Sequence, residues 1–427
     1  MLTTQMIIVL CTLLFMMVML MTHVMPYGVT AMTCCVIFVV TGVCDINTAF
    51  SGLSNSTTIM VATMMVVAGA LGKTSLIKNL RHKLLAFQGK NGIVLILVMY
   101  LFTIILAQLM GQIACLSMML LFIQSLDDES EISPSRMLFT IACVNTVWTS
   151  RLPIGMGATM PGTINSFYQG MVGAGDLLGL ADYFKAGIIP SIAVTLYCLF
   201  TYKLIPSHKI DRSQVKEVKE NESLPKRDEI IIFGVFLAVI GAFMFSNQLG
   251  KLTNIIPAVG VLVLVYTKVL STKETVGILT GDMVFMIAGM SVMSTILGNS
   301  GVGDLIGQTV LKILGNNPSG LFVITVFCLV TTVMTNFMSN MGTMALMSPI
   351  AAATAIAGGM NVKTVVLVVA VSSWFAFALP TGSSATMMAF GIGNHNPFKL
   401  MKFTLPLLLI CIVTLIFGVN LFFPVYG

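Results

Sequence analysis

The chain has 427 residues, of which 57% are hydrophobic and only 9% are charged. So few charged side chains cannot cover the surface of a water-soluble protein of this length, which excludes the soluble classes and predicts a protein embedded in a lipid bilayer. The net charge of +6 would suit a nucleic-acid partner. However, the basic residues lie in loops between apolar runs, so they indicate membrane topology and no nucleic-acid binding.

The apolar runs form two matched series on either side of one polar segment. The first series lies at 5–23, 28–44, 57–72, 92–110, 112–126, 136–170 and 186–203, and the second at 229–246, 253–270, 282–299, 319–335, 343–358, 363–396 and 402–424. The segment between them is too charged to enter a bilayer. The sequence therefore predicts a first repeat over 1–203, a cytoplasmic linker over 204–228 and a second repeat over 229–427.

A nearly constant offset relates the two series. The stretch 152–160 reads almost the same as 379–387, and Pro153 and Pro380 within them lie 227 positions apart. Arg136 and Lys363 are separated by the same distance. One offset at separate places in the chain indicates duplication.

The lengths of the runs predict how the chain crosses the membrane. A helix needs roughly 20 residues to cross the hydrocarbon core, and the segments around 111 and 340 contain arms that are shorter. We expect two helical hairpins, with tips at Gly111-Gln112 and Ser339-Asn340. The runs 136–170 and 363–396 are too long for one crossing, and Pro153 and Pro380 should divide each into two half-helices. The predicted fold is therefore an all-α polytopic membrane protein with two inverted repeats of five crossings, each with a re-entrant hairpin and a discontinuous helix.

The distribution of basic residues supports this topology. If both termini lie outside, 17 of the 22 Lys and Arg residues fall on the cytoplasmic face together with the linker. This asymmetry is what the positive-inside rule requires. We expect a multi-pass protein of the cell membrane.

The interrupted segments are where we expect a binding site. Unpaired backbone groups at membrane depth must be buried in protein or face an aqueous cavity, where carbonyls can bind a cation and helix N-termini an anion. Neutral oxygens and amides there can bind Na⁺ and a small anion without a fixed charge. Each of these residues could instead serve helix packing, as small polar residues in membrane helices often do. The predicted substrate-binding residues are Gln112, Arg151, Asn340, Thr343, Pro380 and Thr381.

Arg151 is the one basic residue that lies inside a predicted span and away from its ends. An arginine within the bilayer is costly and marks functional sites. It could provide a counter-charge for an anionic substrate, or form a buried pair with an acidic residue or helix-end carbonyls.

These motifs resemble the divalent anion/sodium symporter family, within the ion transporter superfamily of di- and tricarboxylate, sulfate and arsenite carriers. Residues 49–55 are similar to the family's Ala-Phe-Ser-Gly-Phe-Ser-Asn helix start. Ser339-Asn340-Met341 stands where the second Ser-Asn-Thr hairpin tip belongs, and residues 380–384 resemble the Pro-Ile-Gly-Thr-Pro loop. The resemblance implies an elevator mechanism, a homodimer and Na⁺ as the coupling ion, with no other cofactor or metal.

The resemblance also implies sodium ligands. The expected residues are Thr335, Ser339, Asn340, Gly382 and Ser383 in the second repeat and Gly155 in the first. The first tip departs from the family, because Gly111-Gln112-Ile113 replaces Ser-Asn-Thr. The first sodium site is therefore expected to be rebuilt or missing.

The sequence thus predicts a secondary active transporter of small anions coupled to Na⁺ or H⁺, with di- or tricarboxylates as the first candidates. A sulfate or arsenite carrier of the same fold is the alternative. A channel is disfavoured because five-crossing inverted repeats indicate alternating access. An intramembrane enzyme is disfavoured because no HExxH, GxSxG or paired intramembrane Asp occurs.

Overall fold

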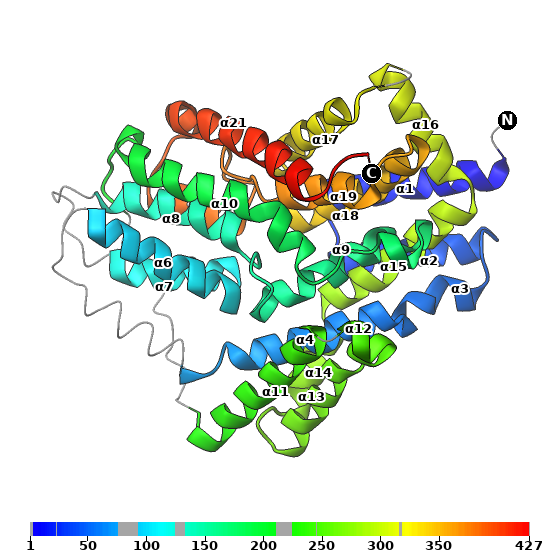
Figure 1. The fold of residues 1–427 in the computed structure, drawn as a ribbon, viewed down its shortest axis with the longest axis horizontal. Coiled ribbons are helices and arrows are strands. Elements are labelled where there is room, and N and C mark those ends of the chain that lie inside the picture. Colours follow the sequence, from blue (N-terminus) through cyan, green and yellow to red (C-terminus); the bar gives the residue numbers. More distant parts are fainter. Residues whose placement is uncertain are drawn as a thin grey trace.

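The computed structural model describes residues 3–22, 24–75, 93–123, 133–210, 224–244, 246–315 and 318–426, and these contain helices and connecting segments with no strand. This is the predicted all-helical membrane architecture (Figure 1). Most of the expected linker, residues 211–223, lies outside the described ranges.

The two halves present similar series of elements. The first half runs α1 (Thr4–Thr22), α2 (Tyr27–Val40), α3 (Ile46–Phe50), η1 (Ser51–Ser54), α4 (Ser56–Leu71), α6 (Ile93–Leu109), α7 (Gln112–Ile123), α8 (Pro134–Trp148), η2 (Gly155–Thr159), α9 (Met160–Tyr168), η3 (Gln169–Met171), η4 (Ala174–Asp176), α10 (Asp182–Thr201) and η5 (Tyr202–Leu204). The second runs α11 (Lys226–Met244), α12 (Ser246–Leu249), η7 (Gly250–Asn254), α13 (Ile256–Tyr266), α14 (Thr272–Leu279), α15 (Asp282–Asn299), α16 (Val302–Leu314), α17 (Gly320–Thr335), α18 (Asn340–Ala357), α19 (Val362–Ser372), α20 (Ser384–Ile392) and α21 (Pro397–Phe422).

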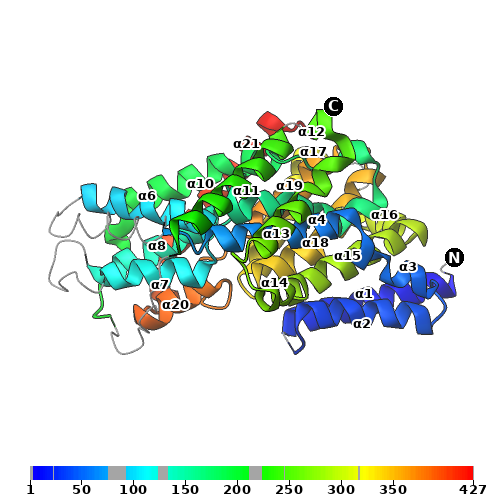
Figure 2. The same ribbon diagram turned by 90° about the horizontal axis from the view of Figure 1, so that it is seen from below.

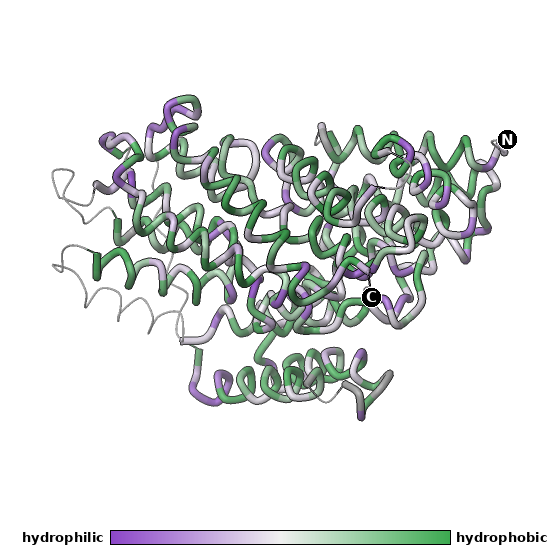
Figure 3. The backbone as a smooth tube through the Cα atoms, turned by 45° about the horizontal axis from the view of Figure 1, so that its top comes forward, coloured by the Kyte–Doolittle hydropathy of each residue, from purple (hydrophilic) through white to green (hydrophobic). Residues whose placement is uncertain are grey.

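The helices are apolar along most of their length, and the polar residues gather at their ends (Figure 3). By length and composition, five segments can each cross a membrane, at 46–71, 182–204, 272–299, 340–357 and 397–422. Shorter apolar helices of 10–17 residues accompany them. This pattern is typical of a multi-pass membrane protein.

Both hairpins form where the sequence predicted them. In the first, α6 and α7 have 17 and 12 residues and are joined at Met110-Gly111. In the second, α17 and α18 have 16 and 18 residues and are joined by residues 336–339. The arms of each hairpin contact each other.

Both long apolar runs are interrupted, but the interruptions begin before the prolines. Helix α8 ends at Trp148 and α19 at Ser372, whereas Pro153 and Pro380 follow several residues later. A proline kink alone would have ended each helix close to the proline. The wider breaks are caused by tertiary contacts with the hairpins.

The two halves pack through a mirrored pair of helix crossings, in which α2 lies on α15 and α13 lies on α4. Figure 2 shows α1 and α2 side by side along one edge, and α15 packs against α2. The backbones of η1 and α15 approach closely, because a Cβ on Gly52 would lie 2.0 Å from the Ala288 carbonyl oxygen. Asp282 fixes the crossing by accepting hydrogen bonds from the Tyr27 and Gly28 backbone N–H groups at 3.1 and 2.8 Å.

Candidate functional site

The side chain of Gln108, at the end of α6, hydrogen-bonds to the backbone of the first interrupted helix. Its Nε2 donates to the Trp148 carbonyl at 2.7 Å, and its Oε1 accepts from the Leu152 backbone N–H at 2.9 Å. These are backbone groups that the end of α8 leaves without helical partners. The side-chain amide therefore satisfies the broken backbone at a buried position, where unpaired groups are expensive.

Asn336, at the end of α17, makes the same set of bonds at the second break. Its Nδ2 donates to the Phe375 carbonyl at 3.0 Å, and its Oδ1 accepts from the Ala378 N–H at 2.9 Å. Both side-chain amides also donate to a carbonyl one turn back in their own helix, at 2.9 and 2.8 Å. Each hairpin is thus fastened to the interrupted helix of its own repeat.

A glycine in each break allows the hairpin to approach. Gly155 has a φ of +55°, and a Cβ there would lie 2.3 Å from the Gln108 carbonyl oxygen. At Gly382 the corresponding contact is 3.0 Å from the Thr335 carbonyl oxygen. The two glycines therefore occupy matching positions in the repeats, with the first under the greater constraint.

Between the hairpin tips and the second break lies a cavity of about 390 Å³. This volume is within the range of small-molecule sites. It contains the expected residues Gln112, Ser339, Asn340, Thr381, Gly382 and Ser383, together with Tyr27, Met341, Trp374, Ser384 and Met387. None of these lining side chains is acidic or basic.

Three helices begin at this cavity. Gln112, Asn340 and Ser384 are the first residues of α7, α18 and α20, and all three line it. Helix N-termini carry partial positive charge and free N–H groups, so their convergence favours an anion. The N-caps of α18 and α20 are Ser339 and Ser383, whose hydroxyls accept from backbone N–H groups at 3.0 and 3.1 Å.

One end of the Asn340 carboxamide faces three oxygens. They are the Gly382 carbonyl and the Thr335 hydroxyl, each at 3.0 Å, and the Ser373 carbonyl at 3.1 Å. The Thr335 hydroxyl hydrogen-bonds to the Ser373 carbonyl. The amide nitrogen satisfies the contacts at that end, where its two hydrogens are shared among the three oxygens; with the amide oxygen there instead, four oxygens converge and a cation among them would remove the repulsion.

Gln112, which matches Asn340 in the first repeat, has different contacts. Its Oε1 accepts from the Ser384 hydroxyl at 3.3 Å, and its backbone carbonyl accepts from Asn145 Nδ2 at 2.9 Å. Thr146 of α8 hydrogen-bonds to Ser383 at 3.3 Å. The first repeat thus contacts the second break directly, and its tip residue is used for that contact.

Some expected residues lie away from the cavity lining. Thr335 and Gly155 are buried at the hairpin–break contacts, and Pro380 is half-buried beside the lining residue Thr381. Thr343 is buried one turn into α18, with a hydroxyl that has no hydrogen-bond partner in the described structure. Arg151 is 1% exposed and lies over Tyr183 of α10, outside the set of lining residues. Their roles in binding stay predictions.

Sequence reasoning missed several residues of the site. Gln108 and Asn145 could have been found from the sequence, because each is a side-chain amide within an apolar run. A polar residue at such a position indicates a buried hydrogen-bond partner. Trp374 lies in the second break, so its position also pointed to the site. Tyr27 gave no signal, because it comes from the start of α2, far away in sequence.

A duplicated all-helical membrane protein with two hairpins and two interrupted helices around a polar cavity has the construction of a secondary transporter. The sequence matches the citrate transporter family CitMHS over residues 16–371 and 249–426. The chain belongs to this family, and it is a transporter and not an enzyme. The family relationship expected from the sequence motifs is confirmed.

Relatives and solved structures agree with this assignment. The chain is 20% identical to an uncharacterized transporter of Haemophilus influenzae over 91% of its own length and 85% of that protein. It is 25% identical to mouse solute carrier family 13 member 1 over 38% of its length, but the match spans only 27% of that relative. A match at 30% identity to an uncharacterized transporter of Synechocystis likewise spans 27% of the relative.

Two solved transporters share the fold. The YdaH transporter of Alcanivorax borkumensis aligns with a TM-score of 0.61 at 11% identity, covering 91% of this chain and 88% of its own. MtrF of Neisseria gonorrhoeae, described among antimetabolite efflux pumps, gives 0.61 at 14% identity, covering 92% and 85%. At such low identity these similarities establish the fold alone.

Proposed function

We propose that the protein carries small carboxylate anions of the di- or tricarboxylate class across the cell membrane, coupled to Na⁺. The observation that carries this proposal is the pairing of an oxygen cluster at Asn340 with three helix N-termini around one uncharged cavity. The cluster offers ligands for a cation and the helix starts offer donors for an anion. Such a pair of neighbouring sites suits symport.

The cation would be held by Thr335, Asn340 and the carbonyls of Ser373 and Gly382. Hard cations take oxygen ligands from carbonyls, amides and hydroxyls. Because no lining side chain is charged, Na⁺ bound in this neutral cluster would bring a full positive charge to the cavity. A bound Na⁺ would therefore raise the affinity for the anion, which is the thermodynamic basis of coupling. Ser339, Ser383 and Gly155 remain candidates for further ligands.

The anion would lie against the starts of α7, α18 and α20. Gln112 and Thr381 supply an amide and a hydroxyl to the lining of the cavity. Because no lining residue is charged, the carboxylates would be held by N–H groups and by the cation. Removal of Na⁺ should therefore abolish substrate binding and not merely weaken it slightly.

We further propose an elevator movement in a homodimer with both termini outside. The hairpins and interrupted helices are joined to one another by Gln108, Asn336 and the Gln112–Ser384 contact. Helices α2, α4, α13 and α15 form a second set through the mirrored crossings. The first set would move as one unit past the second.

Uptake into proteoliposomes tests the proposal. Labelled citrate, succinate and sulfate would each be supplied with an inward Na⁺ gradient and with K⁺ in its place. We expect saturable, Na⁺-dependent uptake of a carboxylate. Uptake of sulfate alone would favour the inorganic-anion alternative, and flux that neither saturates nor follows a cation gradient would contradict carrier function.

A further inference from the structure

Arg151 is a buried cation without a counter-ion. It follows the end of α8, and its guanidinium carbon lies 4.3 Å from the centroid of the Tyr183 ring. Nε donates to the Val147 carbonyl at 3.2 Å, but neither terminal nitrogen has a hydrogen-bond partner among the described residues. The only ion pair within the described ranges joins Lys73 and Glu274, so no described acid neutralises Arg151.

The chain makes room for this guanidinium. A Cβ on Gly187, one turn beyond Tyr183 on α10, would lie 2.3 Å from a terminal nitrogen of Arg151. Arginine keeps its charge inside a protein. A buried charge without a partner is strongly unfavourable, so the site calls for a negative group that the described protein does not supply.

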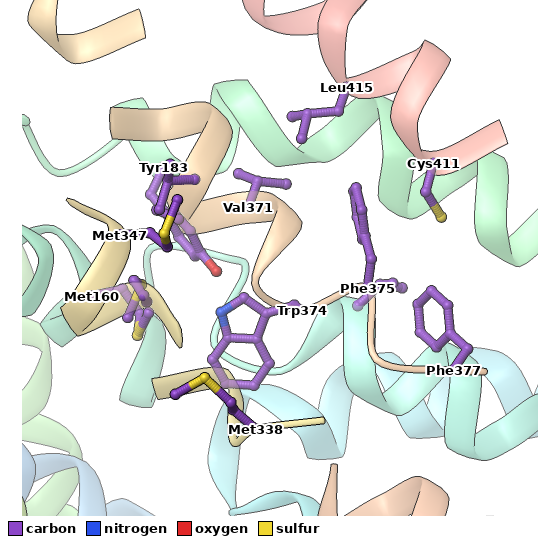
Figure 4. Packing of buried hydrophobic residues seen from close by; sticks show 14 of the residues in the cluster. Met160, Tyr183, Met338, Met347, Val371, Trp374, Phe375, Phe377, Cys411 and Leu415 are labelled. Atoms are coloured by element: carbon purple, nitrogen blue, oxygen red, sulfur yellow. The ribbon is translucent and has the colours of Figure 1, made fainter. Parts of the chain in front are cut away.

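Two further buried donors also lack acceptors, one on Tyr183, against which Arg151 packs, and one on Trp374. The Tyr183 hydroxyl and the Trp374 indole N–H are buried and have no hydrogen-bond partner in the described parts of the chain. Figure 4 shows these two polar atoms pointing toward one another, from α10 and from the segment that follows α19. A water molecule needs acceptors as well as donors, whereas a group of donors around a cation is suited to an anion.

We propose that Arg151, Tyr183 and Trp374 form an internal anion site that adjoins the cavity at the hairpin tips. Trp374 belongs to both, because it lines the cavity while its N–H faces Tyr183. The site takes one small anionic group, either an inorganic anion such as a halide or one carboxylate of a transported molecule. The inference does not depend on the proposed Na⁺ coupling, because binding alone reveals it.

The tryptophan content of the chain allows a direct measurement. Only two tryptophans are present, Trp148 and Trp374. In a Trp148→Phe background, emission reports on Trp374 alone, and iodide quenches indole fluorescence on contact. Trp148 donates to Thr195 at 2.9 Å, so this background must first be shown to be monodisperse and to keep a cooperative thermal transition.

We expect iodide, titrated at constant ionic strength against methanesulfonate, to quench Trp374 along a saturating curve. Arg151→Gln should abolish the saturable component, and Tyr183→Phe should weaken iodide affinity by about fivefold or more, since it removes a donor to the anion but keeps the ring. Arg136→Gln, at the other end of α8, is the matched control and should leave the curve unchanged.

Quenching that rises linearly with iodide and has the same slope in the parent and in Arg151→Gln would overturn the proposal. If Arg151→Gln does not fold, unchanged iodide affinity in Tyr183→Phe would overturn it equally. Addition of citrate then distinguishes the sources of the anion. Displacement of iodide identifies a carboxylate subsite of the substrate, and no displacement identifies a resident inorganic anion.

Discussion

Gln108 and Asn336 are symmetry-related amides that perform the same task in opposite halves of the molecule. Each ends the first arm of a hairpin and bonds to one carbonyl and one N–H of the neighbouring interrupted helix. Both side chains are buried, at 1% and 4% exposure. The interruptions are therefore products of tertiary hydrogen bonding as much as of proline.

Truncation of these amides should destabilise the protein. Asn336→Ala leaves the Phe375 carbonyl and the Ala378 N–H without partners, at about 1–3 kcal/mol for each buried group. We expect a lower Tm in detergent and uptake reduced by about tenfold or more, because these bonds position the interrupted backbone next to the binding cavity. Asn299→Ala, at an exposed helix end, should match the parent. Equal Tm and uptake in Asn336→Ala would show that the amide bonds are dispensable.

Sodium should stabilise the purified protein through Thr335. Ligands that bind the folded state raise Tm with concentration, so NaCl should raise Tm above choline chloride at equal ionic strength. Thr335→Val removes a hydroxyl oxygen at nearly constant volume and should increase the Na⁺ concentration for half-maximal stabilisation by about tenfold or more.

Thr331→Val provides the matched control for this sodium measurement. Thr331 lies one turn earlier on α17, and its buried hydroxyl has no hydrogen-bond partner in the described ranges. Its Na⁺ dependence should equal that of the parent. If choline and Na⁺ stabilise the parent equally, the oxygen cluster at Asn340 does not bind Na⁺.

The two break glycines should differ in their tolerance of a methyl group. Gly155→Ala combines a positive φ with a clash at 2.3 Å, whereas Gly382→Ala meets its nearest neighbours at 2.9–3.1 Å and has an ordinary φ. We expect Gly155→Ala to abolish uptake and lower Tm, and Gly382→Ala to reduce uptake less. Gly173→Ala, with no atom within 4 Å of its Cβ, is the control. The reverse order of severity would refute this account of the breaks.

Stability should fall in mild acid through His395. This side chain lies in the turn between α20 and α21, and burial lowers its pKa below the ordinary 6.5, while nearby His208 lowers the pKa further. Burial favours the neutral ring in the folded protein. The contribution of His395 to the free energy of unfolding is therefore fully present above pH 6.5 and is lost as the pH falls from there through the lowered pKa.

Thermal melts at pH 7.5 and 5.5 measure this effect. The parent should lose more Tm between the two values than His395→Gln, which cannot be protonated. His208→Gln removes the facing ring, whose centroid lies 5.7 Å away, and should reduce the loss in part. An identical loss in the parent and in His395→Gln would assign the acid sensitivity to other groups.

The sequence by itself determined the class of protein, the matched helices, the hairpins and the presence of two interruptions. These follow from span length, apolar composition and helix-breaking residues, which act locally and can be counted along the chain. Several cavity residues, including Gln112 and Asn340, were found for the same reason, because they stand at the breaks and tips.

Only the tertiary structure decided which polar side chains face one another. It placed Gln108 on the backbone of the first break, brought Tyr27 to a cavity formed largely by the second repeat, and put Arg151 against α10 instead of in that cavity. The direction of a side chain around its helix depends on the packing of neighbouring helices, and this is not encoded in hydropathy or in the spacing of prolines.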